Sequence, residues 1–132
     1  MAVTCIDMST GSLVWASAGH PTSYVFDSAG EIKNELPSTG LPLGILADRP
    51  YAIGRGVNIA PGDVVLMMTD GFLEAQNTGD VEFGRDRLFQ VMRTSASLPA
   101  EEIVQRLHDA VRIFSGGQPQ NDDLTAVVCR RK

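Results

Sequence analysis

The chain has 132 residues, of which 43% are hydrophobic and 20% are charged, and its formal net charge is −5. These values are typical of one globular domain, and we expect a single domain over residues 1–132. Apart from Arg130-Arg131-Lys132 at the end there is no lysine or arginine cluster, which argues against a nucleic-acid partner. No apolar run is long enough to cross a bilayer, and the first residues lack a signal-peptide layout. We therefore expect a cytoplasmic protein with no membrane partner.

Both cysteines, Cys5 and Cys129, lie in apolar segments typical of strands, and they lack Cys-x-x-Cys spacing. This pattern favours two buried free thiols. A disulfide or a catalytic thiol is the less favoured alternative.

The first half of the chain predicts short strands separated by turns. We expect strands over residues 2–8, 13–18, 22–27, 32–36 and 51–59. The first two should pair as a hairpin across the turn at Ser9-Thr10-Gly11. Residues 37–46 are too rich in proline and glycine for a regular element and too apolar for a solvated linker. They predict a packed loop that crosses the sheet.

The central feature is a run of five apolar residues, Val64 to Met68, which predicts a strand buried on both faces. Asp70 follows the end of this strand, which would fix the direction of its carboxylate, and Gly71 permits a sharp turn. The Asp-Gly pair alone equally predicts an ordinary turn. A second acidic pair, Asp122-Asp123, directly precedes the last apolar strand, expected over residues 124–129, and favours a functional role.

Two helices are expected in the second half, after a polar surface loop over residues 76–83. Residues 85–93 predict a short helix. A longer one begins near Pro99 and ends before Gly116-Gly117. Its apolar residues fall on one face, which indicates contact with a sheet. His108 on this helix is expected to be exposed or half-exposed and not a ligand.

The separated carboxylates, Asp70 and Asp122-Asp123, would be brought together by a single core. Mg²⁺ and Mn²⁺ prefer oxygen ligands and retain several waters, so one or two aspartates can anchor such an ion. The absence of a Cys/His cluster in the sequence argues against zinc. From spacing alone, an ordinary surface acidic pair remains the alternative.

Six motifs in order resemble the metal-dependent serine/threonine phosphatases of the PP2C superfamily, in particular the bacterial SpoIIE/RsbU branch. They are Ala18-Gly19-His20-Pro21, Gly40-x-Pro42-Leu43-Gly44, Pro61-Gly62-Asp63, Thr69-Asp70-Gly71-Phe72-Leu73-Glu74-Ala75, Phe83-Gly84-x-x-Arg87-Leu88 and Asp122-Asp123-Leu124-Thr125. The resemblance covers essentially the whole chain.

The resemblance implies an α+β fold, a PP2C-like antiparallel β-sandwich flanked by helices, with two Mn²⁺ or Mg²⁺ ions at one end. A metal-bound water would attack the phosphorus of phosphoserine or phosphothreonine. By resemblance Asp70 and Asp122 are metal ligands, Asp123 ranks third, and Gly71 lies close beside the site. His20 matches a turn position near it, where local hydrogen bonding is the expected role.

The chain departs from the family pattern at its beginning. Members carry an upstream Gly-Asp-x-x-Gly motif whose aspartate bridges the two metals, and this sequence has none. We expect a partial domain, incomplete at the N-terminus, whose metal centre is incomplete and which is inactive or weakly active alone. A half-sandwich would also expose an apolar sheet face, which predicts a homodimer or capture of a partner.

Three functions are compatible with these features. The first is the C-terminal part of a protein phosphatase; its branch suggests a phosphorylated anti-sigma-factor antagonist as the substrate. The second is a catalytically inactive interaction module of the same fold. The third, a receiver-type phosphoacceptor module, is disfavoured because strands here precede the helices instead of alternating with them.

Overall fold

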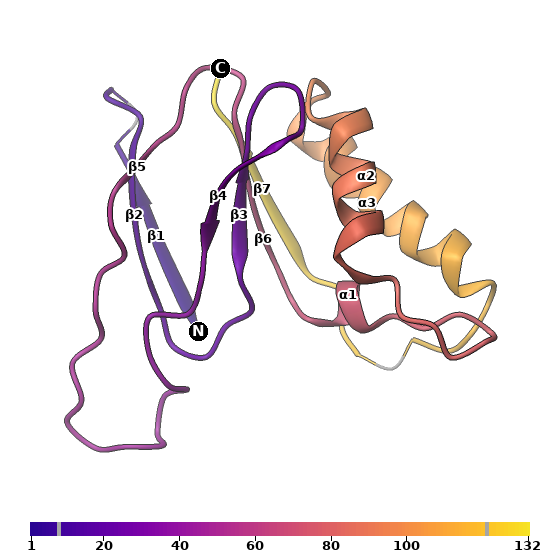
Figure 1. Cartoon of the computed structure of the whole chain (residues 1–132), viewed down its shortest axis with the longest axis horizontal. Coiled ribbons are helices and arrows are strands. Elements are labelled where there is room, and N and C mark those ends of the chain that lie inside the picture. Colours follow the sequence, from indigo (N-terminus) through magenta and orange to yellow (C-terminus); the bar gives the residue numbers. More distant parts are fainter. Residues whose placement is uncertain (8, 121) are drawn as a thin grey trace.

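The computed structural model describes residues 1–7, 9–120 and 122–132. Within these residues the chain forms two antiparallel sheets and three helices (Figure 1). In chain order the elements are β1 (Ala2–Ile6), β2 (Ser12–Ser17), β3 (Ser23–Phe26), β4 (Ile32–Leu36), β5 (Val57–Asn58), β6 (Val64–Met68), α1 (Gly71–Glu74), α2 (Gly84–Ser95), α3 (Ala100–Ser115) and β7 (Ala126–Arg130).

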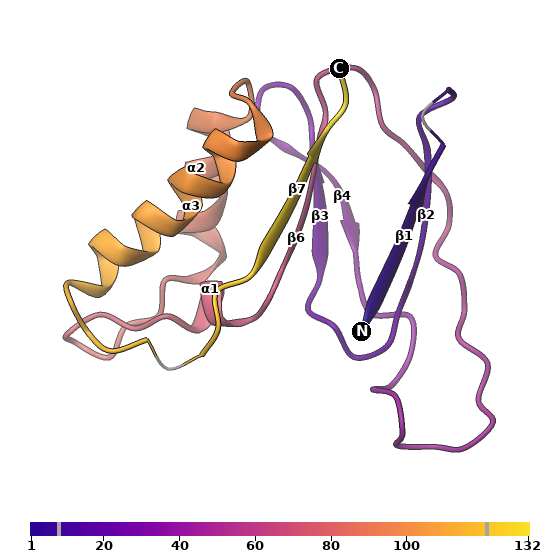
Figure 2. The same cartoon turned by 180° about the vertical axis from the view of Figure 1, so that it is seen from behind.

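The two sheets lie against each other, and α2 and α3 cover the far side of the larger one (Figures 1 and 2). The smaller sheet has the strand order β1-β2-β5, and the larger has the order β4-β3-β6-β7. All strand pairs within them are antiparallel. The expected α+β fold, an antiparallel sandwich flanked by helices, is confirmed. No helix among the described residues has the length and apolarity needed to cross a membrane.

The larger sheet separates two hydrophobic cores. Val65 lies in the core between the sheets, whereas its neighbours Val64 and Leu66 lie in the core beneath the helices. Successive side chains of a strand point to opposite faces, so β6 contributes to both cores. Its prediction as a strand buried on both faces is confirmed. Burying each of these side chains stabilises the fold by roughly 1.5–3 kcal/mol.

The strand directions bring three chain segments to one end of the sandwich. In the register of the larger sheet, Tyr24 on β3 pairs with Leu66 and Ala126 on β7 pairs with Met68. Because both neighbours run antiparallel to β6, the residues that precede β3 and β7 lie at the end where β6 stops. This is the lower end in Figure 1, where α1 also lies.

The clearest helix is confirmed as α3. Pro99 occupies its N-cap position, and Gly116 ends it in the left-handed conformation, with φ of 60°. Its buried side chains, Ile103, Leu107 and Val111, belong to the core beneath the larger sheet. The short helix predicted over residues 85–93 is confirmed as α2, which extends beyond both ends of that range.

Two predictions about the first half are wrong. The expected strand over residues 51–59 is reduced to Val57–Asn58, because Gly54 and Gly56 interrupt it. The loop over residues 37–46 does not pack throughout. Thr39 is held to Ser17, but residues 41–50 are all exposed, because the chain extends there beyond both sheets (Figure 1).

Strand boundaries also differ from expectation by a few residues. The predicted strand over residues 2–8 ends at Ile6, and residue 8 lies outside the described residues. The last strand begins at Ala126, two residues later than expected.

The expectation of a buried Cys5 is wrong. Cys5 is exposed on the outer face of the smaller sheet, where β1 alternates between inward and outward side chains; Cys129 is half-buried, and both thiols are free. Val3, which is 56% exposed, and Val14, which is 37% exposed, share the outer face. An apolar sheet face is therefore exposed, whereas the homodimer it suggests remains a prediction.

Candidate metal centre

Asp70 lies at the N-cap of α1, a short helix that the sequence analysis did not anticipate. Its carbonyl oxygen accepts hydrogen bonds from the amides of Leu73 and Glu74, at 2.8 and 3.0 Å. Its carboxylate makes no capping hydrogen bond and is exposed. The backbone of Asp70 thus begins the helix, while its carboxylate is available for a ligand.

Thr69 joins the two acidic segments. Its hydroxyl donates to the carbonyl oxygen of Asp123 at 2.7 Å and accepts from the amide of Thr125 at 3.1 Å. Its own amide donates to the Thr125 carbonyl oxygen at 3.0 Å. Three hydrogen bonds therefore hold the segment after β6 against the segment before β7. Sequence reasoning missed this role, since it depends on a partner more than fifty residues away.

Gly71 is a position of close backbone approach. A Cβ atom added there would lie 2.7 Å from the carbonyl oxygen of Asp123 and 3.5 Å from the carbonyl carbon of Asp122. A distance below 3.0 Å is a steric clash, so a larger residue would push the acidic segment away. The packing of the two segments requires glycine here.

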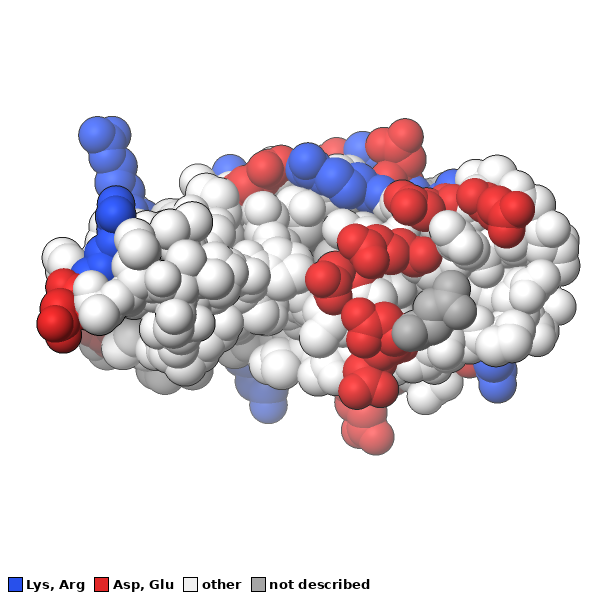
Figure 3. Space-filling model, turned by 90° about the horizontal axis from the view of Figure 1, so that it is seen from below, with Lys and Arg blue, Asp and Glu red and all other residues white. Residues whose placement is uncertain are grey.

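Asp122 and Asp123 are both exposed, and their backbone groups are held in place. The Asp122 carboxylate accepts a hydrogen bond from the Asp123 amide at 2.7 Å, and the Asp122 carbonyl oxygen accepts one from Gln120 at 2.7 Å. Acidic side chains form a band on this end of the molecule (Figure 3). Asp70 and Asp122 are thus presented from neighbouring segments on an acidic surface.

His20 lies in the segment before β3, at the same end of the sandwich. Its Nδ1 atom is 2.9 Å from the Pro21 carbonyl oxygen, so Nδ1 carries the proton and donates. The preceding Gly19 donates to the Gly40 carbonyl oxygen at 3.1 Å. A Cβ on Gly19 would lie 2.4 Å from Pro42. A local hydrogen bond thus occupies the Nδ1 atom of His20. The segment that contains Gly19 and His20 packs against the segment that contains Gly40 and Pro42.

Two further motifs serve the architecture. Asp63 is buried; its carboxylate accepts from the Lys33 ammonium at 2.6 Å and from the Ala60 amide at 2.8 Å. Arg87 donates to the Phe83 carbonyl oxygen at 2.9 Å, and its guanidinium stacks 4.5 Å from the ring centre of Phe114. Asp63 stabilises the turn that enters β6, at the opposite end of that strand from Asp70, and Arg87 joins α2 to α3.

The carboxylate groups at this site are of the type that binds a hard cation, but the described residues offer too few of them for a complete coordination shell. Carboxylate oxygens such as those of Asp70 and Asp122 are the ligands that Mg²⁺ and Mn²⁺ prefer. In residues 1–7, 9–120 and 122–132, however, no group of three or more His, Cys, Asp or Glu side chains is arranged to hold a metal. The roles of Asp70 and Asp122 as metal ligands therefore remain predictions.

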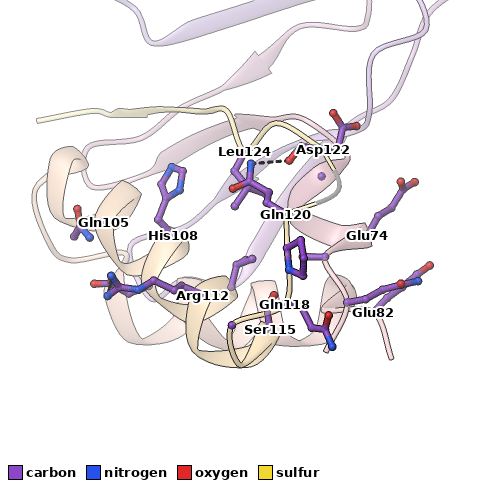
Figure 4. A pocket seen from close by; sticks show the side chains of 17 residues that line it. Glu74, Glu82, Gln105, His108, Arg112, Ser115, Gln118, Gln120, Asp122 and Leu124 are labelled. Atoms are coloured by element: carbon purple, nitrogen blue, oxygen red, sulfur yellow. Dashed lines mark hydrogen bonds and ion pairs between the residues drawn. The ribbon is translucent and has the colours of Figure 1, made fainter. Parts of the chain in front are cut away.

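A pocket of about 440 Å³ adjoins this end, between α1, α3 and the loop that leads to β7. Gly71 and Asp122 line it, so it opens beside the candidate metal ligands. His108, half-exposed as expected, stands on α3 in this pocket, with its ring 5.0 Å from the ring centre of Phe72 (Figure 4). The sequence alone does not predict this pocket, because the wall of the pocket comes from three separate segments.

Comparison with known proteins identifies the class. The family model described as "Stage II sporulation protein E (SpoIIE)" matches residues 1–132, and the chain belongs to this family of PP2C-type phosphatase domains. Protein IcfG of Synechocystis sp. (strain ATCC 27184 / PCC 6803 / Kazusa) is 31% identical over 126 residues. The match covers 96% of this chain and 19% of that protein.

Solved structures agree with this assignment. The SiaA-PP2C domain of Pseudomonas aeruginosa superimposes with a TM-score of 0.81 at 26% identity, over 98% of this chain and 50% of that one. The PP2C phosphatase domain of SpoIIE from Bacillus subtilis, with a fragment of its regulatory domain, gives 0.78 at 24% identity, over 96% and 36%. The latter likeness shows the fold alone. The chain thus spans half or less of these relatives.

Proposed function

We propose that this chain is the C-terminal part of a metal-dependent phosphatase domain that hydrolyses phosphoserine or phosphothreonine in a protein. The observation that carries the proposal is the pair of hydrogen bonds by which the Thr69 hydroxyl holds the Asp70 segment against the Asp122-Asp123 segment. Two exposed carboxylates thereby share one end of a sandwich whose family consists of phosphatase domains.

In this proposal Asp70 and Asp122 are the metal ligands that the chain contributes. Bound Mn²⁺ or Mg²⁺ would supply an activated water and neutralise phosphate charge. Asp123 is the third-ranked candidate ligand, and its carbonyl oxygen accepts the hydrogen bond from Thr69. Gly71 permits the close approach of the two segments. His20, near the site, supports the turn that precedes β3.

The proposed substrate is a phosphorylated protein in a bacterial signalling pathway in the cytoplasm, an anti-sigma-factor antagonist. This suggestion rests on the branch, which includes a structure of the RsbU and RsbW domains of a Mycobacterium tuberculosis protein. That chain is matched at 23% identity with a TM-score of 0.71. It supports the fold, and the substrate remains a proposal.

The second candidate function is a catalytically inactive interaction module. It is favoured by the lack, among the described residues, of a group of three metal-binding side chains. A homodimer through the exposed apolar sheet face fits either function. Light scattering of the purified chain tests association, and a compact monomer at high concentration would contradict it.

Hydrolysis of a phosphoserine peptide by the chain tests the phosphatase proposal. The assay compares Mn²⁺ with EDTA, and the wild type with Asp70→Ala and the exposed helix variant Asp86→Ala. Because the chain is proposed to be only part of the domain, its turnover alone should be weak at most. The phosphatase proposal predicts that any such turnover depends on Mn²⁺, is abolished by Asp70→Ala and is retained by Asp86→Ala. Turnover that survives Asp70→Ala would contradict the proposed ligand. Absence of turnover in a folded chain would fit either the interaction module or a part of a phosphatase domain that needs the family's upstream motif.

A further inference from the structure

The pocket beside the candidate metal centre has a mixed lining that suits a polypeptide. Its volume of about 440 Å³ lies in the usual range of ligand pockets, about 300–1,000 Å³. Ala75, Val111 and Leu124 give it apolar surface. Four glutamines also line it, namely Gln76, Gln105, Gln118 and Gln120. Each side-chain amide both donates and accepts hydrogen bonds, as a peptide backbone does.

Most of these amides are available. Gln120 donates to the Asp122 carbonyl oxygen, as Figure 4 shows. The side-chain amides of Gln76, Gln105 and Gln118 have no hydrogen-bond partner within the part of the chain that the structure describes. An occupant with its own amide groups could satisfy them, whereas a purely apolar occupant would leave them unpaired.

The charges on the pocket favour a basic occupant. Four carboxylates line it, from Glu74, Glu82, Asp109 and Asp122, and one guanidinium, from Arg112. Arg112 donates to the Asp109 carboxylate at 2.7 Å, so these two charges neutralise each other. Glu74 and Glu82 are exposed and lie on the other side of the pocket from Arg112 (Figure 4). Even with Asp122 committed to a metal, two carboxylates remain to attract a cation.

We infer that this pocket binds a basic segment of the phosphorylated protein substrate, next to the phosphorylated residue. The inference rests on the proposed function, because it takes Asp122 as a metal ligand and places the phosphoryl group at that end of the pocket. Lysine or arginine side chains of the substrate would meet Glu74 and Glu82, while its backbone would bond to the glutamine amides. The pocket would then select substrates by the charge of the residues that flank the phosphate.

The first experiment measures binding of fluorescently labelled peptides to the 132-residue chain at low ionic strength. The probes are a peptide with lysine and arginine beside a central serine, the same peptide with glutamates there, and phosphoserine forms of both. In EDTA the unphosphorylated basic peptide should bind about tenfold more tightly than the acidic one, and salt should weaken this binding. Equal binding of the two unphosphorylated peptides in EDTA would overturn the inference.

Two variants locate the binding. Glu74→Gln/Glu82→Gln should weaken binding of the basic peptide by about two- to fivefold per charge removed, the size typical of exposed ion pairs. Glu101→Gln/Glu102→Gln, at exposed positions of α3 outside the pocket, is the matched control and should bind as the wild type. Ser115→Trp should block the pocket and abolish binding, whereas Gln90→Trp on the exposed side of α2 should not. Equal effects of each pocket variant and its control would overturn the inference.

Mn²⁺ separates this inference from the proposed function. The phosphoserine should add affinity only with Mn²⁺, and Asp70→Ala should remove that increment while leaving the EDTA binding intact. Loss of the charge preference, with the Mn²⁺ increment intact, overturns the pocket and leaves the phosphatase proposal standing. A charge preference without any Mn²⁺ increment supports the pocket and contradicts the metal centre.

Discussion

The hydroxyl of Thr69 donates a 2.7 Å hydrogen bond to the carbonyl oxygen of Asp123, across 54 positions of the chain. This bond links the end of β6 to the segment that enters β7. Because Asp70 and Asp122 are the immediate neighbours of the bonded residues, their relative position depends on this contact. The candidate site is therefore built by a neutral side chain that is not itself a proposed ligand.

Thr69→Val should loosen the site, since valine keeps the shape but removes the hydroxyl. The Asp123 carbonyl oxygen and the Thr125 amide would each lose a partner; both groups are exposed, so the change should cost about 0.5–1.5 kcal/mol of unfolding free energy. Thr69→Ser keeps the hydroxyl and should therefore retain most of the unfolding free energy. Urea denaturation measures the effect, and Mn²⁺ affinity should fall with Thr69→Val and recover with Thr69→Ser. Full Mn²⁺ affinity in Thr69→Val would contradict the positioning role.

Gly71→Ala should displace the acidic segment. The new methyl group would lie 2.7 Å from the Asp123 carbonyl oxygen, a clash with backbone that costs about 1–3 kcal/mol. Gly56→Ala is the control, because the nearest neighbour of its new methyl group, the Leu13 carbonyl oxygen, would be an ordinary 3.7 Å away. Amide NMR shifts should change at Asp123 and Thr125 in the first variant. Unchanged amide shifts at Asp123 and Thr125 would contradict the close approach of Gly71 to the Asp123 carbonyl oxygen.

Lys33→Met should destabilise the fold more than Arg93→Met. Asp63, 3% exposed, would be left buried without its cation, whereas the Glu31 partner of Arg93 is solvated. The first change should cost about 1–3 kcal/mol and the second less than about 1 kcal/mol. Thermal unfolding of both variants measures the difference. Equal losses would mean that Asp63 is satisfied by the Ala60 amide alone.

Asp7 should contribute to the loss of stability in acid. Hydrogen bonds from the Ser9 hydroxyl, the Ser9 amide and the Thr10 amide lower the pKa of Asp7 from 3.8 to about 2. A carboxyl whose pKa is lower in the folded state stabilises the fold above its unfolded pKa, and this contribution disappears as the pH falls toward 2. Urea midpoints at pH 5 and pH 2.5 should therefore differ less in Asp7→Asn than in the wild type.

The control for this pH dependence is Asp86→Asn, at an exposed position of α2. It should leave the difference between the two urea midpoints close to that of the wild type. A wild-type-sized difference in Asp7→Asn would mean that the three hydrogen bonds do not persist in solution.

Local patterns predicted the regular elements well. The apolar run of β6 and the amphipathic stripe of α3 were both confirmed, since burial against one core fixes such patterns directly. The failures at Leu43 and Cys5 depend on partners distant in sequence, whereas the strand over residues 51–59 was interrupted by its own glycines. Nothing local distinguishes the exposed Leu43 from a packed one, and Cys5 faces outward because of which side of β1 meets the larger sheet.

The candidate site shows the same difference between features that local sequence indicates and features that depend on distant segments. Resemblance singled out Asp70 and Asp122, with Asp123 third, and the structure places their segments together. Their roles as ligands remain predictions. The contribution of Thr69 and the pocket beside Glu74 emerged only from the fold, because both are made by segments that meet after folding. Residue types can indicate a chemistry, but the three-dimensional arrangement determines which groups support it.

The central claim is that this chain contributes Asp70 and Asp122 to a metal centre. A Mn²⁺ titration of the 132-residue chain, followed by electron paramagnetic resonance, tests it most directly. Asp70→Asn and Asp122→Asn should each weaken Mn²⁺ binding by on the order of tenfold or more, whereas Asp86→Asn should bind as the wild type. Mn²⁺ binding that is the same in all three variants and the wild type would contradict the account.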